Sequence, residues 1–90
     1  MQSKEIEIIN QLGLHARAAA KFVGAAGRFD CSIKVGRTVD SLVDGKSIMS
    51  VMMLAASKGT KLQLITDGTD EQEAIDAIVE LVENYFGEGK

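Results

Sequence analysis

Residues 60–82 read TKLQLITDGTDEQEAIDAIVELV, a stretch in which the hydrophobic period changes from that of a strand to that of a helix. Leu62 and Leu64 alternate with polar neighbours, which is typical of a strand with one buried face. Asp67 and Gly68 form a turn signal, and apolar residues then recur at helical spacing. The expected helix has an apolar stripe of Ile75, Ile78, Val79, Val82 and either Tyr85 or Phe86. The stretch therefore predicts a strand, a turn and an amphipathic helix.

The same two patterns organise the rest of the chain, and Asp70 is the expected N-cap of the last helix. Because each element is apolar on one side only, the order βαββαβα predicts an α+β fold with one four-stranded sheet and all three helices on one side. A ferredoxin-like domain, βαββαβ, is the fold-level alternative. The remaining strands are expected at 4–9, 31–35 and 38–43, and the remaining helices at 16–27 and 47–56.

The composition allows one small domain over residues 1–90, with 46% hydrophobic residues to form its core. A single cysteine, Cys31, excludes an internal disulfide and a multi-cysteine metal site, and its inward strand position predicts a core residue. No apolar run approaches the roughly 20 residues of a membrane span, and the N-terminus lacks a signal-peptide core. Four aromatic residues are few for nucleic-acid stacking. We therefore expect a cytoplasmic protein that binds neither membrane nor nucleic acid.

The only histidine, His15, lies in Gly13–Leu14–His15–Ala16–Arg17, where a loop meets an expected helix. The first N–H groups of a helix lack partners within it, and the helix dipole places partial positive charge there, so such a start binds phosphate. Arg17 adds a planar fork of donors for phosphate oxygens. A neutral imidazole is a nucleophile near physiological pH. These residues could accept and stabilise a phosphoryl group; the alternative is an ordinary helix-cap histidine.

Two other chemistries are not supported around His15. No P-loop and no acidic cluster for magnesium are evident, so the chain could carry a phosphoryl group but not load itself from a nucleotide. One histidine without a cysteine cluster provides too few ligands for a metal site. We therefore expect neither a metal nor another cofactor.

Ser47 precedes an apolar run and is a natural N-cap, or alternatively a phosphorylation site at a helix start. The run that follows is apolar all round, although a short surface helix needs only one apolar stripe. If Val51, Leu54 and Ala55 face the core, the remaining apolar side chains lie partly outward and suit partner docking. Periodicity alone leaves this phase open. The outward candidates are Ile48, Met49, Met52 and Met53.

The chain resembles the HPr phosphocarriers of the bacterial phosphoenolpyruvate-dependent sugar phosphotransferase system. The resemblance lies in two motifs, Gly13–Arg17 and Lys46–Ser47–Ile48–Met49, in their separation and in the order of the predicted elements. The resemblance covers essentially the whole chain and implies an open-faced β-sandwich with an antiparallel sheet. It implies that His15 accepts a phosphoryl group on Nδ1 from Enzyme I and passes it to an Enzyme IIA domain, with Arg17 holding the phosphate. Ser47 matches the serine modified by HPr kinase/phosphorylase. The implied docking face comprises Ala16, Arg17, Ala20, Ile48, Met49, Met52 and Met53.

The charges divide unevenly along the chain. Residues 1–66 carry nine basic and five acidic side chains, and residues 67–90 carry one basic and eight acidic ones. Either this split steers partners, or the last helix is simply acidic and solvated. Arg17, Lys21 and Lys46 flank the two motifs and predict an electropositive partner face. A carrier that presents one face to successive partners suits a monomer.

Two departures from the family pattern affect the motifs. Ala18 stands where many members have proline, and Ser50 stands where glycine or lysine is common. Alternative functions are a regulatory phosphotransferase chain related to nitrogen control or lacking permeases, and a binding module that depends on Ser47 alone. A small metal- or RNA-binding domain would need a Cys-x-x-Cys loop or a basic, aromatic sheet face, and the sequence has neither.

Overall fold

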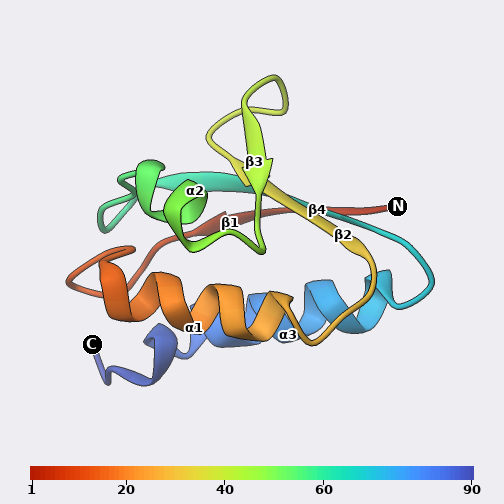
Figure 1. Cartoon of the computed structure of the whole chain (residues 1–90). Coiled ribbons are helices and arrows are strands. Elements are labelled where there is room, and N and C mark those ends of the chain that lie inside the picture. The colour runs from red at the N-terminus through yellow and green to blue at the C-terminus, as the bar shows by residue number, and fades with distance from the viewer.

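The structure is a computed structural model that describes residues 1–90, and Figure 1 shows the whole chain. Strands and helices alternate along the chain as the hydrophobic patterns predict. The strands are β1 (Gln2–Glu7), β2 (Ser32–Gly36), β3 (Leu42–Asp44) and β4 (Lys61–Asp67). The helices are α1 (Ala16–Ala26), α2 (Ile48–Met53) and α3 (Glu71–Glu83), followed by the 3-10 turn η1 (Tyr85–Gly87).

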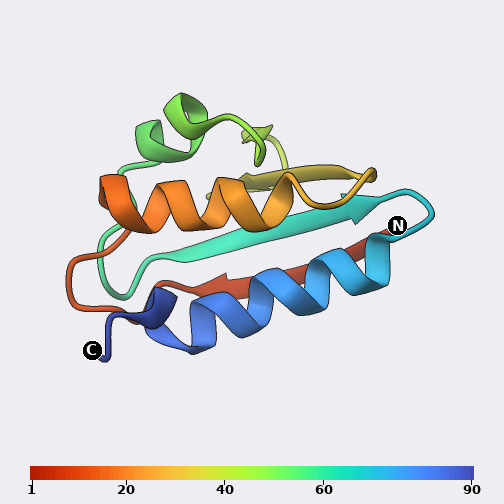
Figure 2. The same cartoon turned by 60° about the horizontal axis from the view of Figure 1, so that its bottom comes forward.

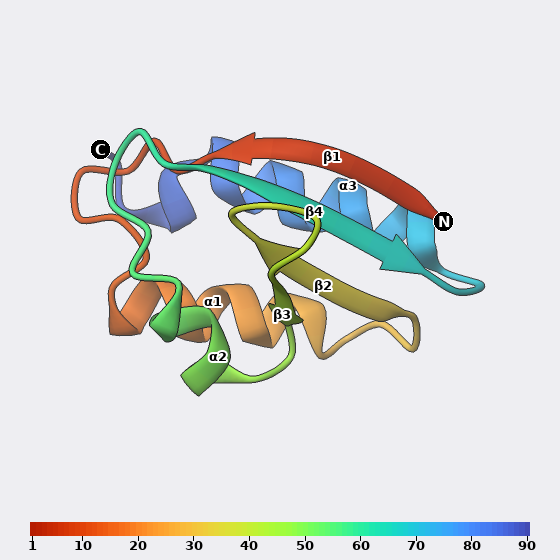
Figure 3. The ribbon, with the colours of Figure 1, turned by 90° about the horizontal axis from the view of Figure 1, so that it is seen from above.

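The four strands form one antiparallel sheet in the order β1-β4-β2-β3. The central strand β4 lies between β1 and β2, as the view from above shows (Figure 3). Its Leu62 pairs with Ile6 of β1 and its Leu64 with Val35 of β2, and all four side chains are buried. The alternation predicted from sequence therefore aligns the apolar residues of neighbouring strands on one face.

The helices make the fold open-faced. Helices α1 and α3 run beneath the sheet, while α2 lies at its rim, in contact with α1 and β3 (Figures 1 and 2). The core lies between the sheet and the two long helices, and Phe22, Ile78 and Phe86 are among its fully buried side chains. The opposite face of the sheet is uncovered (Figure 3). The predicted α+β fold, an open-faced sandwich with a four-stranded antiparallel sheet, is confirmed.

Several predicted boundaries are wrong. Residues 38–41 form a turn, in which Ser41 N–H donates to Thr38 O at 3.1 Å, so β3 is only three residues long. The first strand spans residues 2–7, although Ile8 beyond it is still buried and donates its N–H to Thr60 O at 2.9 Å. Helix α2 ends at Met53, because Ala55 has a left-handed φ of 50°.

Asp70 is the N-cap residue of α3, as predicted, but its side chain does not cap the helix. Its carboxylate accepts the N–H groups of Asp30 and Cys31 at 2.8 and 2.9 Å instead. The Asp30 N–H is the main reason that the pKa of Asp70 lies below its usual range. Asp70 therefore fixes the turn that leads into β2. Cys31 is buried, as predicted, and its burial raises the pKa of the thiol.

No helix of the chain combines the length and the apolar character that crossing a membrane requires.

Candidate functional site

The turn before His15 is anchored from two sides. Gly13 has φ +70°, and a Cβ there would come within 2.6 Å of Ala56 O, so only glycine fits. Leu14 N–H donates to the same Ala56 carbonyl at 2.8 Å, which ties the turn to the segment after α2. From the other side, the buried Asn10 side chain donates to Gly13 O at 2.8 Å. The position of His15 is therefore set by backbone contacts that hold the turn in one shape.

His15 is the N-cap residue of α1, but its side chain forms no capping hydrogen bond. The first N–H group with an acceptor is that of Ala19, which donates to His15 O at 2.8 Å. The N–H groups of Ala16, Arg17 and Ala18 have no acceptor in the chain. The predicted open helix start is therefore present, with three free donors beside the imidazole.

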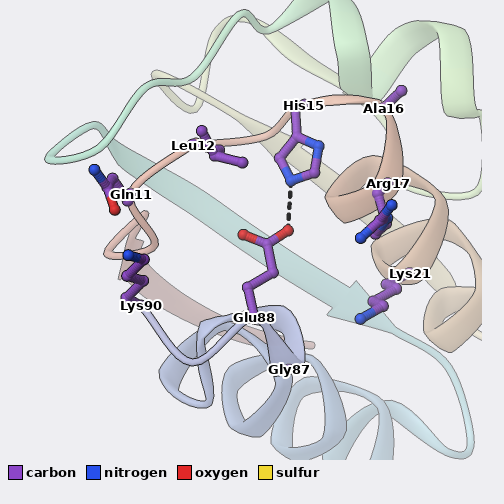
Figure 4. Close-up of a pocket in the computed structure, with 9 residues that line it drawn as sticks. All are labelled: Gln11, Leu12, His15, Ala16, Arg17, Lys21, Gly87, Glu88 and Lys90. Atoms are coloured by element: carbon purple, nitrogen blue, oxygen red, sulfur yellow. Dashed lines mark hydrogen bonds and ion pairs between the residues drawn. The ribbon is translucent and has the colours of Figure 1, made fainter.

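The imidazole is held by a residue that the sequence analysis did not identify, Glu88. One carboxylate oxygen of Glu88 pairs with His15 Nε2 and the other accepts the Asn10 amide at 3.0 Å (Figure 4). These two contacts, that with Asn10 first, hold the pKa of Glu88 below its ordinary value of 4.5. The carboxylate form therefore stabilises the fold above that value, and this contribution is lost as the pH falls below it. No local pattern could have revealed Glu88, since it lies 73 residues from His15.

An open pocket of about 800 Å³ surrounds the imidazole. Arg17 projects into the same space and has no hydrogen bond or ion pair, so its guanidinium is available to a ligand (Figure 4). Lys21 donates from Nζ to Phe86 O at 2.6 Å and remains a positive charge at the wall. The lining residues are Gln11, Leu12, His15, Ala16, Arg17, Lys21, Gly87, Glu88 and Lys90. Such a pocket suits a small anion that contacts both His15 and Arg17.

Ser47 is the N-cap of α2, as predicted, and its hydroxyl accepts the N–H of Ser50 at 3.4 Å. The residue is half-buried. The neighbouring Lys46 donates from Nζ to Phe29 O at 2.6 Å, so its ammonium is held against the end of α1. The electropositive face predicted from Arg17, Lys21 and Lys46 thus contains one unpaired side chain, Arg17, and two lysines bound to carbonyls.

The apolar residues of α2 whose direction periodicity left open point outward. Val51 is buried and Leu54 is half-buried, but Ala56 rather than Ala55 completes the inward side, because the helix ends before these residues. Helix α2 contacts α1 and lies beside its first turns (Figures 2 and 3). Ala16, Arg17 and Ala20 of α1 are exposed on the surface. The exposed apolar side chains of α2 are Ile48 (39%), Met49 (68%), Met52 (39%) and Met53 (79%).

The fold and the site together define a class: small open-faced α+β phosphocarriers with one histidine at an open helix start. A family model described as the PTS HPr component phosphorylation site matches residues 2–84. The phosphocarrier protein HPr of Pseudomonas putida is 64% identical over the full length of both chains. The chain belongs to the HPr family of the phosphotransferase system.

Solved structures support the same assignment. The HPr-C-His structure from Thermoanaerobacter tengcongensis matches with a TM-score of 0.92 and 46% identity, covering 98% of each chain. An HPr structure from Bacillus anthracis matches with a TM-score of 0.83 and 36% identity, covering 90% of this chain and 95% of that one. The fold is therefore that of HPr rather than the ferredoxin-like alternative, and the general role is that of a phosphocarrier with protein partners in the phosphotransferase system.

Proposed function

We propose that His15 accepts a phosphoryl group from phosphorylated Enzyme I and passes it to an Enzyme IIA domain. The observation that carries this proposal is the open start of α1, where the first three N–H groups have no acceptors and where His15, Ala16 and the unpaired Arg17 line one pocket. Backbone donors and a guanidinium are the groups that stabilise a transferring phosphoryl group.

The surroundings of the imidazole support Nδ1 as the attacking atom. Nε2 of His15 is engaged by Glu88, whereas the other ring nitrogen faces Ala16 and Arg17 (Figure 4). The lone pair of Nδ1 therefore attacks phosphorus while the bond from phosphorus to the donor atom of Enzyme I breaks. Arg17 and the first N–H groups of α1 hold the phosphoryl oxygens. In the onward step the bond at Nδ1 breaks and the acceptor in Enzyme IIA provides the new bond.

The docking surface for both partners is proposed as Ala16, Arg17, Ala20 and the four exposed apolar residues of α2, Ile48, Met49, Met52 and Met53. Methionine side chains adapt to different partner surfaces, which suits a carrier that binds two proteins in turn. The donor and acceptor must reach the same imidazole, so one face serves both and the carrier acts as a monomer.

Ser47 is proposed as a regulatory phosphorylation site for an HPr kinase/phosphorylase. Its hydroxyl begins the helix that carries the four apolar residues, so a phosphate there would add negative charge within the docking surface. Phosphorylation would weaken docking of Enzyme I without removing the imidazole.

Incubation with Enzyme I and labelled phosphoenolpyruvate tests the main proposal. Wild type is expected to gain one acid-labile phosphoryl group, His15→Ala none, and Ser47→Ala one. Adding an Enzyme IIA domain should then discharge the label. An active Enzyme I that leaves the wild-type protein unlabelled would refute the proposal.

A further inference from the structure

The chain after α3 folds back in an unusual conformation. Tyr85, Phe86 and Gly87 have successive φ values of +57°, +52° and +76°, in the left-handed region that non-glycine residues rarely adopt. Such strain persists only where the surroundings determine the conformation. Here the Phe86 side chain is fully buried and its carbonyl accepts Lys21 Nζ at 2.6 Å. The segment is therefore held in one conformation that points the next residue at the pocket.

The residue that follows this turn is Glu88. Its side chain is only 12% exposed and lies between Asn10 and His15 (Figure 4). Asn10 is itself fully buried and is fixed by its bond to Gly13 O. The chain thus builds a line of contacts, Asn10 to Glu88 to His15, from three separate segments.

We propose that Glu88 is a positioning residue for phosphoryl transfer, whose carboxylate keeps the proton on Nε2 of His15 and the lone pair on Nδ1. This inference rests on the proposed transfer to His15. A carboxylate oxygen can only accept a hydrogen bond, so the proton in this contact belongs to Nε2. The opposite tautomer would carry its proton on Nδ1, so that Nδ1 would have no free lone pair with which to attack phosphorus.

The same contact acts during the transfer. When Nδ1 donates its lone pair to phosphorus, the bond from phosphorus to the donor atom breaks and the ring becomes positively charged while Nε2 keeps its proton. The Glu88 carboxylate lies against that N–H and stabilises the charge. In the onward step the N–P bond at His15 breaks, its electron pair returns to Nδ1, and the ring becomes neutral again. No proton leaves the imidazole in either direction.

Asn10 makes the role of Glu88 testable by a small change. In Glu88→Gln the amide oxygen has to face the donating Asn10 amide, which turns the new NH₂ group toward His15. That group can only donate, so it favours the tautomer with a free Nε2 and a protonated Nδ1. Glu88→Ala removes the contact without imposing the wrong tautomer. Glu88→Gln should therefore impair phosphoryl transfer more than Glu88→Ala does, although glutamine resembles glutamate more closely than alanine does.

The experiment compares wild type, Glu88→Gln, Glu88→Ala and the control Glu83→Gln, which removes an exposed charge on the last turn of α3. Long-range ¹H–¹⁵N NMR of the unphosphorylated proteins should show the Nε2–H tautomer in wild type and control, a mixture in Glu88→Ala and mainly Nδ1–H in Glu88→Gln. The kcat for phosphorylation by Enzyme I should fall by up to about 10⁴-fold in Glu88→Gln, as it does elsewhere for a wrong histidine tautomer. It should fall about tenfold in Glu88→Ala.

The KM for the carrier should change little in either variant. An unchanged tautomer in Glu88→Gln would overturn the inference. So would equal losses of transfer activity in the two variants, if these losses appeared in KM and paralleled a loss of thermal stability. Glu88 would then have only a structural role. The NMR result does not depend on transfer, so failure of wild type to accept phosphate would refute the proposed function separately.

Discussion

Helices α1 and α2 contact each other, yet the unpaired N–H groups at their starts are satisfied differently. At α1 the cap residue His15 offers no side-chain acceptor, three N–H groups stay free, and the histidine is held from outside by Glu88. At α2 the Ser47 hydroxyl closes the helix start by accepting Ser50 N–H. An open start can receive an anion, whereas a self-capped start is already satisfied. The comparison separates a start suited to transfer from one suited to holding a docking surface in place.

The largest expected effect of a substitution outside the histidine–glutamate contact is at the open start. Arg17→Gln removes the only unpaired guanidinium at the pocket and should lower kcat for phosphorylation by about 100-fold, since a lost charge-stabilising donor costs that much in other sites. Arg28→Gln, which removes the same charge near the far end of α1, is the control and should leave kcat unchanged. Equal rates for Arg17→Gln and the control would show that the open start does not hold the phosphate.

The next effect concerns the docking side of the comparison. Met49→Ala combined with Met53→Ala should raise the KM for Enzyme I about tenfold. The kcat should be retained, because these exposed side chains would contact the partner and not the reacting atoms. Val39→Ala truncates another exposed apolar side chain, 60% exposed and in the turn before β3, and serves as the control. A rise in KM that is the same for both proteins would place the docking surface elsewhere.

A smaller effect tests the closed start directly. Ser47→Ala should lower the free energy of unfolding by about 0.5–1 kcal/mol, because Ser50 N–H loses its acceptor and the 3.4 Å bond is a long one. Urea denaturation measures the change. Ser50→Ala keeps the capping bond, which uses the backbone N–H of residue 50, and should stay within about 0.3 kcal/mol of wild type. If both variants lose the same stability, the hydroxyl of Ser47 is not a cap.

The smallest effect uses the free N–H groups of α1. Ala18→Pro removes an N–H that has no acceptor and should raise the free energy of unfolding by about 0.5 kcal/mol through the entropy of the unfolded chain. Ala19→Pro is the matched control: it removes the bond to His15 O and should cost about 3 kcal/mol. Thermal unfolding of the two variants measures both changes. If Ala18→Pro lowered the free energy of unfolding as much as the control does, residue 18 would not be at an open helix start.

The sequence predicted most of the scaffold because its signals are local. Alternation in Lys61–Asp67 and the apolar stripe of Glu71–Glu83 identify the central strand and the long helix next to it. Boundaries failed where backbone geometry overrides pattern: Thr38–Ser41 alternates like a strand but closes a turn. Asp70 is the N-cap residue of α3, as predicted, but its carboxylate accepts N–H groups of a segment 40 residues away instead of capping the helix.

The site divides in the same way. His15, Arg17 and Ser47 could be identified because each stands beside an expected helix start, which is a local feature. Glu88 could not, since its approach to His15 depends on three consecutive left-handed residues and on burial of Phe86. A strained conformation of this kind comes from tertiary packing and leaves no periodic signal in the sequence. The acidic segment 67–90 therefore contributes Glu88 to the pocket, although the uneven division of charge predicted only basic residues around His15.

The most direct test of the comparison between the two helix starts is ¹⁵N–³¹P NMR of the protein after phosphorylation by Enzyme I. We expect one phosphoryl group, bonded to Nδ1 of His15, with Nε2 still protonated and Ser47 unmodified. A phosphoryl group on Nε2, or on the hydroxyl of Ser47, would contradict this expectation.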